Sequence, residues 1–270
     1  MWRLLLGLLI VGCASTQLGA QPIGASSVPI DQRAAYVRDF AAVEPADLEA
    51  RIQRYALTDI ILYGIGPQLA NDPAGLARAI GALRARGVRI LAPVANLTRL
   101  RALVAFCRET GVRFDGLVTE HEFWNRSDRA VAFREIEGLL VAMRAQIFAW
   151  GAPGARIGAY LGYPTAAEAT RLATLVHFVF ANYAVKDPER AYRHIHKGVP
   201  LRDRLARFVK ARVAVWPIFY ASGEVDMRGA LAARGLTTSE ASFRAAQAAD
   251  LELRDEPVAG FVYFTIESMP

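Results

Sequence analysis

Residues 88–123 read VRILAPVANLTRLRALVAFCRETGVRFDGLVTEHEF. This sequence predicts one strand–helix–strand unit, and the rest of the predicted fold follows from it. Two apolar runs, Val88–Val94 and Phe114–Phe123, are rich in β-branched and aromatic residues and predict buried strands. Between them, Leu97–Thr110 has apolar residues at helical spacing and is followed by Gly111, a residue that commonly ends helices. Strands joined by a helix run parallel, and a parallel sheet is covered on both faces.

The same alternation of strand and helix continues on both sides of this stretch. Six more strand-like segments are predicted, at Tyr36–Phe40, Asp59–Ile65, Arg156–Gly162, His177–Val185, Val213–Tyr220 and Gly260–Ile266. A succession of eight such strands with a helix after each of the first seven predicts an α/β fold, a single (β/α)8 TIM barrel. An open doubly wound sheet is the alternative, although no Gly-rich phosphate-binding turn follows the first strand.

Composition narrows the class of protein further. The chain has 270 residues, 53% of them hydrophobic and 21% charged, which excludes disordered, collagen-like and coiled-coil proteins. The net charge is +6, but the arginines are spread along the helical segments, so we expect no nucleic-acid partner. Two cysteines are too few for a disulfide scaffold or a multi-cysteine metal site. His194 and His196 have no third ligand nearby in the sequence, so we expect neither a metal nor a cofactor.

The N-terminus has the pattern of a targeting segment. The apolar run Leu4–Gly12 follows a basic start and is too short to cross a bilayer, but it suits the core of a signal peptide. The run ends at Cys13 in a sequence that resembles the bacterial lipobox, in which the cysteine is lipidated. We therefore predict a lipoprotein signal peptide over residues 1–12 and lipidation of Cys13. Cleavage after Ala20, as in an ordinary secreted protein, is the alternative.

The predicted domain organisation follows from this leader. Residues 13–32, rich in Ser, Gly, Gln and Pro, predict a flexible tether, and residues 33–270 form the barrel domain. A lipidated Cys13 would attach the protein to a membrane without spanning it. Ala14 follows the cysteine. The resemblance of this position to bacterial lipoproteins implies a lipid-anchored protein of the bacterial cell envelope, at the outer membrane.

Phe114–Phe123 also has the clearest chemical signal, because side chains alternate along a strand. Val118, Glu120 and Glu122 share one face, and if that face is the inner one, two carboxyl groups lie near the mouth of the barrel, about 6–7 Å apart at Cα. Crowded carboxyl groups raise one pKa and so retain a proton for general acid catalysis. Alternatively, one glutamate pairs with an arginine such as Arg156 and closes the barrel. His121 alternates with the glutamates and is expected to face the helices.

The sequence from Asp115 to Glu122 resembles the fourth-strand signature of the family 18 glycoside hydrolases, the chitinase and endo-β-N-acetylglucosaminidase family. That signature is Asp-Gly-x-Asp-x-Asp-x-Glu. Asp115, Gly116 and Glu122 match it, Glu120 replaces an aspartate conservatively, and Val118 replaces the innermost aspartate.

The resemblance implies a substrate-assisted mechanism. Glu122 would be the general acid that protonates the glycosidic oxygen. Glu120 would orient the acetamido group of the substrate, which attacks the anomeric carbon in place of an enzyme nucleophile. Because the substrate supplies the nucleophile, the spacing of the carboxyl groups does not report stereochemistry.

Two later strands resemble the family more weakly. Tyr183 takes the place of the tyrosine that contacts the acetamido oxygen, but Ala184 replaces the aspartate that follows it. Phe264 takes the place of the tryptophan under the sugar, and Glu267 that of an acid. Ser222–Pro257 contains only helical sequence, so a compact barrel without the insertion domain of many chitinases is expected.

Polar and aromatic residues at predicted strand ends are further candidates for contact with a sugar, because aromatic rings stack on sugar faces and amides bind hydroxyl groups. The candidate substrate-binding residues are Trp124, Asn125, Tyr160, Asn182, Trp216, Tyr220 and Phe264.

These observations favour a lipid-anchored glycoside hydrolase that acts on N-acetylglucosamine-containing glycans. The replacements at Val118, Ala184 and Phe264 leave open a second interpretation, a hydrolase-like barrel that binds glycans without cleaving them. The third is an unrelated barrel enzyme or a structural lipoprotein of the envelope.

Overall fold

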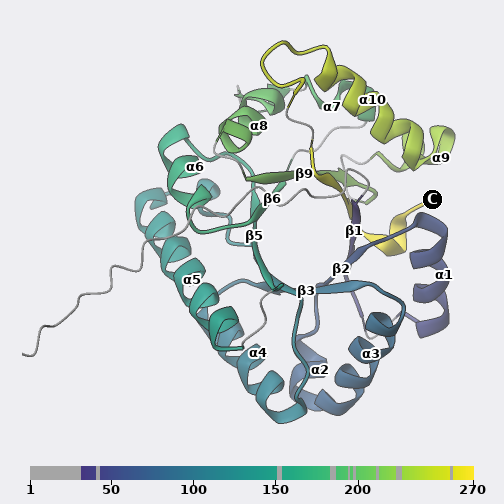
Figure 1. Cartoon of the computed structure of the whole chain (residues 1–270), viewed down its shortest axis with the longest axis vertical. Helices are drawn as coiled ribbons and strands as arrows, with labels where there is room; N and C mark the ends of the chain where they lie inside the picture. Colours follow the sequence, from purple (N-terminus) through teal and green to yellow (C-terminus); the bar gives the residue numbers. More distant parts are fainter. Residues whose placement is uncertain are drawn as a thin grey trace, which may run out of the picture.

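The computed structural model describes residues 32–40, 43–150, 154–182, 187–193, 195–196, 199–210, 213–222, 227–255 and 258–270. The barrel strands are β1 (Gln32–Val37), β2 (Asp59–Leu62), β3 (Arg89–Val94), β4 (Gly116–Thr119), β5 (Arg156–Leu161), β6 (Phe178–Ala181), β9 (Ala214–Tyr220) and β10 (Gly260–Phe264). All neighbouring pairs are parallel, and β1 pairs with both β2 and β10, so the sheet is closed. The predicted (β/α)8 TIM barrel is confirmed, and the residues between Gln32 and Phe264 close it (Figure 1).

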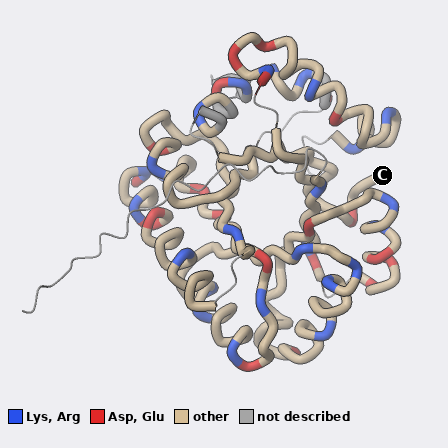
Figure 2. The backbone as a smooth tube through the Cα atoms, viewed as in Figure 1, with Lys and Arg blue, Asp and Glu red and all other residues tan. Residues whose placement is uncertain are grey.

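Helices form the outer layer of the barrel (Figure 1). They are α1 (Pro45–Tyr55), α2 (Gly66–Asn71), α3 (Pro73–Ala85), α4 (Leu97–Thr110), α5 (Arg129–Ala149), α6 (Ala166–Ala173), α7 (Pro188–Ala191), α8 (Leu201–Lys210), α9 (Arg228–Arg234) and α10 (Leu236–Ala248), with 3-10 turns at Phe123–Asn125 and Ile266–Ser268. Charged residues are spread over these helices all around the barrel (Figure 2). Within the described ranges, no helix has the length and apolar character needed to cross a membrane.

Local sequence explains where the clearest helices begin and end. Gly111 ends α4 with φ 73°, a left-handed conformation that glycine adopts without steric cost. Thr165 caps α6 by accepting a hydrogen bond from the backbone of Glu168, whose side chain binds the Thr165 backbone in return. A short antiparallel pair, β7 (Ile195–His196) and β8 (Val199–Pro200), was not predicted and lies outside the barrel sheet.

The barrel wall has two apolar faces, because alternate side chains of each strand point inward and outward. The inner cluster is dominated by aromatic residues, among them Tyr36, Phe178, Phe180 and Trp216, which fill the interior. Gly158 on β5 provides room for one of these rings, since a Cβ atom there would lie 2.1 Å from Phe178.

A buried carboxylate holds charges together at the amino-terminal end of the barrel. Asp59, at the start of β2, is fully buried and accepts hydrogen bonds from Arg89 (2.6 Å) and Arg156 (3.4 Å) at the starts of β3 and β5. The Arg156 guanidinium also lies 5.4 Å from the centre of the Phe178 ring. A buried charge is tolerated when it is paired in this way. The Asp59 carboxylate therefore joins β2 to β3 and β5 at this end of the barrel.

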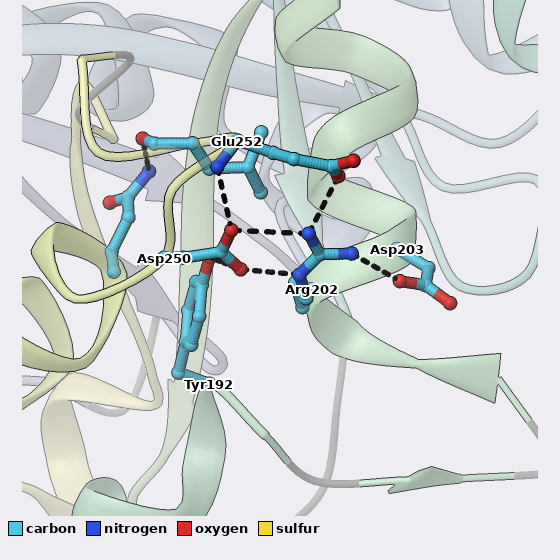
Figure 3. Close-up of polar contacts among 7 residues, drawn as sticks. Tyr192, Arg202, Asp203, Asp250 and Glu252 are labelled. Carbon is cyan, nitrogen blue, oxygen red and sulfur yellow. Dashed lines mark hydrogen bonds and ion pairs between the residues drawn. The ribbon is translucent and has the colours of Figure 1, made fainter.

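A second polar cluster joins three outer segments (Figure 3). Arg202 on α8 contacts Asp203, Asp250 and Glu252, and the Tyr192 hydroxyl donates a 3.0 Å hydrogen bond to Asp250. Arg202 lowers the pKa of Asp250 to about 2. The cluster therefore holds α8 and the end of α7 against the segment that follows α10.

Several strand boundaries differ from the prediction, and two of them bear on the site. β1 begins at Gln32 rather than Tyr36, and β4 ends at Thr119 rather than Phe123. After Thr119 the backbone bonds to itself instead of to a neighbouring strand, as in the 3.0 Å hydrogen bond from the Phe123 amide to the His121 carbonyl. The two glutamates of interest therefore follow the strand instead of lying within it.

Candidate active site

A pocket of about 290 Å³ lies at the carboxyl-terminal mouth of the barrel. It is lined by Tyr36, Tyr63, Glu120, Glu122, Tyr160, Ile218, Tyr220 and Phe264. These residues lie within or just beyond five strands and the loop after β2, so the pocket is assembled from segments far apart in the sequence. Active sites of TIM barrels form at this end.

Both glutamates face the pocket. Val118 belongs to the inner cluster, and the alternation of β4 carries Glu120 to the same side above it. Glu122 lies farther out and is exposed, and its Oε2 accepts a 2.8 Å hydrogen bond from the Asn125 amide. His121 points the other way, with its Nε2 3.4 Å from the Glu135 carboxylate on α5, as predicted.

Burial changes the protonation of Glu120. Loss of solvent raises its pKa to about 7, and the negative charge of Glu122 also raises it, while the Tyr36 hydroxyl has the opposite effect. This hydroxyl is buried and has no partner within hydrogen-bond distance in the part of the chain that the structure describes, but it faces Glu120 closely enough to interact with it. Near neutral pH, Glu120 therefore retains a proton far more readily than an ordinary carboxyl group does.

An amide joins two tyrosines in the part of the pocket wall that β5, β6 and β9 form. The Asn182 Nδ2 donates to the Tyr160 hydroxyl (2.5 Å), and the Tyr220 hydroxyl donates to the Asn182 Oδ1 (2.8 Å). The two hydroxyl oxygens are 3.3 Å apart. Burial raises the pKa of Tyr160 far above its usual value and that of Tyr220 to about 12, so both remain hydroxyl groups. Tyr160 also interacts with Glu122, which places a hydroxyl donor beside that carboxyl group.

The structure brings together only some of the predicted site residues. Glu120, Glu122, Tyr160, Tyr220 and Phe264 line the pocket, and Asn125 and Asn182 bind its lining side chains. The predicted catalytic Tyr183 and the predicted lipidation site Cys13 lie outside the described residues.

Two predicted sugar-binding aromatics do not line this pocket. Trp124 is buried against Phe123 and Tyr160 in the turn after β4. Trp216 is 1% exposed and packs against Phe180 inside the barrel. Both belong to the apolar core that supports the pocket.

Three residues that line the pocket were not predicted: Tyr36, Tyr63 and Ile218. Tyr36 was missed because the first strand was placed four residues too late, which put Tyr36 at its beginning. Tyr63 follows the apolar run of β2 directly, and a polar aromatic at such a strand end is the signal that identifies it. Glu267, which the resemblance compares with a family acid, accepts hydrogen bonds from the backbone amides of Arg38 (2.8 Å) and Asp39 (3.3 Å) and does not line the pocket.

Known structures resemble this one in fold. A mutant GH18 chitinase from Cycas revoluta in complex with (GlcNAc)4 superimposes with a TM-score of 0.56 and 10% sequence identity, over 88% of this chain and 95% of that chain. The fold is shared with glycoside hydrolases. A chitinase from the same organism in complex with (GlcNAc)3 gives a TM-score of 0.54 at 11% identity, with the same coverage. Gas2 of Saccharomyces cerevisiae in complex with compound 7 gives 0.55 at 11% identity, over 86% of this chain and 56% of that chain.

These similarities are confined to structure. No protein-family model matches the amino-acid sequence, and no curated protein matches it. The described residues contain no group of three or more His, Cys, Asp or Glu placed to hold a metal ion. The chemistry of the pocket therefore has to be argued from its own side chains.

Proposed function

We propose that this protein is a glycoside hydrolase that cleaves N-acetylglucosamine-containing glycans with the help of the substrate's acetamido group. The observation that carries the proposal is the pair of carboxyl groups, Glu120 and Glu122, facing one pocket at the mouth of the barrel. Two carboxyl groups in different environments, one half-buried and one exposed, are the usual means of dividing acid and charge-stabilising roles in glycoside hydrolysis.

In this proposal Glu122 is the general acid and Glu120 binds the acetamido N–H. In the free protein the proton of the pair resides on Glu120, because Glu120 is the more buried group. A donated hydrogen bond from the substrate favours the ionised form of Glu120 and leaves the proton to Glu122, which is close enough to influence it. Binding of the correct substrate thereby moves the proton to the residue that needs it.

The bond changes then follow. Glu122 protonates the glycosidic oxygen as the bond to the anomeric carbon breaks, and the acetamido oxygen forms a new bond to that carbon. Ionised Glu120 stabilises the positive charge that develops on the cyclised group. Water, deprotonated by Glu122, attacks the anomeric carbon and restores the acetamido group, which returns the proton to the pair.

The other lining residues suit a neutral sugar. Tyr160 and Tyr220 present hydroxyl groups that their raised pKa values keep protonated. Tyr63 and Phe264 supply ring surfaces on which the apolar face of a sugar can stack.

A second candidate function is glycan binding without cleavage. The observation that favours it is Val118, which is fully buried in the inner cluster beneath Glu120, where the signature that this strand resembles has an aspartate. If catalysis requires that third carboxyl group, the pocket binds sugars without hydrolysing them.

We also propose that the protein is anchored through a lipidated Cys13 in a bacterial cell envelope, at the outer membrane, a proposal that rests on the sequence alone. A Cys13→Ser variant is expected to move from the membrane fraction to the soluble fraction when expressed in bacteria. A protein that is soluble with Cys13 intact, and begins after Ala20, would support ordinary secretion instead.

The decisive experiment is hydrolysis of a chromogenic chitobiose glycoside and a panel of N-acetylglucosamine-containing glycans. The protein without residues 1–20 is compared with Glu122→Gln and with the control Glu109→Gln, an exposed glutamate on α4. Turnover that falls at least about 100-fold in Glu122→Gln only would support the proposed acid. Saturable binding without turnover would favour the second candidate. The absence of both binding and turnover would overturn both candidate functions.

A further inference from the structure

The outer surface has a groove between α4 and α5, on the side of the barrel opposite α9 and α10 (Figure 1). Its volume is about 690 Å³, more than twice that of the mouth pocket. Its walls are mainly alanine and aliphatic side chains, among them Leu97, Leu100 and Val104 of α4. Arg101 and Arg108 are its charged lining residues, and none of its lining residues is acidic.

Large apolar side chains project from the same two helices. Phe148 is 89% exposed, Val141 56% and Leu97 47%. On α5 the exposed positions 138, 141, 145 and 148 recur at helical spacing, so one face of this helix has no covering element in the described part of the chain. Contiguous exposed apolar surface is a feature of protein–protein and membrane interaction sites.

The two arginines of the groove lack the carboxylate partners that several arginines of the barrel have. Arg84, Arg129 and Arg202 each pair with a carboxylate. Among the residues that the structure describes, neither Arg101 nor Arg108 forms an ion pair, and both are exposed. They lie seven positions apart, which is two helical turns, and so project from the same face of α4.

We propose that this groove docks on an anionic lipid surface, with Phe148, Val141 and Leu97 inserted among the acyl chains and Arg101 and Arg108 bound to phosphate groups. Projecting apolar side chains and unpaired guanidinium groups on the same two helices are the combination that binds the interface of a negatively charged bilayer. Guanidinium groups bind phosphate oxygens with two hydrogen bonds, whereas lipid tails impose no shape on the side chains that enter them.

Charge argues against a second copy of the chain as the occupant. A symmetric dimer through this groove would bring the two arginines of each copy toward those of the other, with no acid in either lining. An acidic helix from another protein is the remaining alternative, and the experiment separates it from a lipid surface.

Docking is measured by co-sedimentation with vesicles of phosphatidylglycerol and phosphatidylcholine, and with vesicles of phosphatidylcholine alone. The protein begins after residue 20, because the barrel closes within Gln32–Phe264 and the lipid anchor must be absent. Binding is expected only to the anionic vesicles and is expected to weaken as salt is added. Arg101→Gln with Arg108→Gln is expected to reduce the partition coefficient about 30-fold, and Phe148→Ser about tenfold.

Matched controls come from the far side of the barrel. Arg54→Gln with Arg254→Gln removes the same charge from α1 and from the segment after α10, and Leu251→Ser removes a leucine that is 82% exposed. Equal losses in the groove variants and these controls, or equal binding to neutral vesicles, would overturn the proposal. Dimerisation that the arginine variants strengthen, without vesicle binding, would assign the face to a second copy. Absence of vesicle binding with capture of an acidic amphipathic peptide would assign it to a protein helix. Hydrolysis of chitobiose is independent of all these outcomes.

Discussion

Replacing Glu120 by Gln is expected to stabilise the barrel above neutral pH. The pKa of Glu120 is raised from 4.5 to about 7, chiefly by burial. An acid with a higher pKa in the folded chain weakens folding as pH rises, because the unfolded chain loses its proton first. The penalty is absent below pH 4.5, grows between pH 4.5 and about 7, and is constant above that. At about 1.36 kcal/mol per pKa unit, it reaches about 3 kcal/mol.

Urea unfolding of the two proteins at a series of pH values measures this effect. The variant is expected to exceed the original protein in free energy of unfolding by about 3 kcal/mol at about pH 8 and to differ little at about pH 4. Glu109→Gln, on the exposed surface of α4, controls for a general effect of removing a carboxylate. A difference between the Glu120 variant and the original protein that stays constant over this range would refute the argument that Glu120 retains its proton because it is buried.

Other perturbations test the support of the pocket. Asp59→Asn leaves two arginines at the base of the barrel without their carboxylate, and a loss of about 3–5 kcal/mol in urea unfolding is expected. Gly158→Ala places a Cβ atom 2.1 Å from the Phe178 ring, so a loss of about 1–3 kcal/mol is expected, and unchanged stability would contradict the tight packing inside the barrel. Tyr36→Phe removes an interaction that lowers the pKa of Glu120. The decline in stability should therefore still begin near pH 4.5 but extend to a higher pH, as followed by urea unfolding across pH.

The fold could be predicted because apolar periodicity repeats in every βα unit. Eight apolar runs separated by amphipathic segments specify parallel strands, and a closed barrel covers both faces of such a sheet. Strand boundaries were less predictable. β4 was expected to reach Phe123, but it ends at Thr119 because the backbone after Thr119 bonds to itself in a turn. Hydrogen-bond choices of this kind depend on neighbours that a linear pattern does not contain.

The sequence predicts the face of the barrel wall to which a candidate side chain points. It does not predict how near that side chain lies to the mouth of the barrel. Alternation along β4 correctly brings Glu120 to the inner face, and the same reasoning on β9 brings both Trp216 and Tyr220 inward. Alternation does not say how high a residue lies, because height depends on the stagger between neighbouring strands. Trp216 therefore lies in the core, while Tyr220 reaches the pocket. The bridge from Asn182 to two tyrosines joins separate strands and has no signature in the sequence.

The apolar side chain of Val118 limits the direction in which a proton can leave Glu120. Beneath Glu120 lie Val118 and the aromatic side chains of the inner cluster, and the Tyr36 hydroxyl that faces Glu120 has a pKa well above its usual value of 10. Within this described cluster, no carboxylate or imidazole lies deeper in the barrel to accept a proton from Glu120. Every proton that the pocket delivers to a leaving group must return from the solvent side, past Glu122, before the next cycle. A bound glycan that covers this entrance would leave a single proton for the leaving group, and the attacking water would have to replace it.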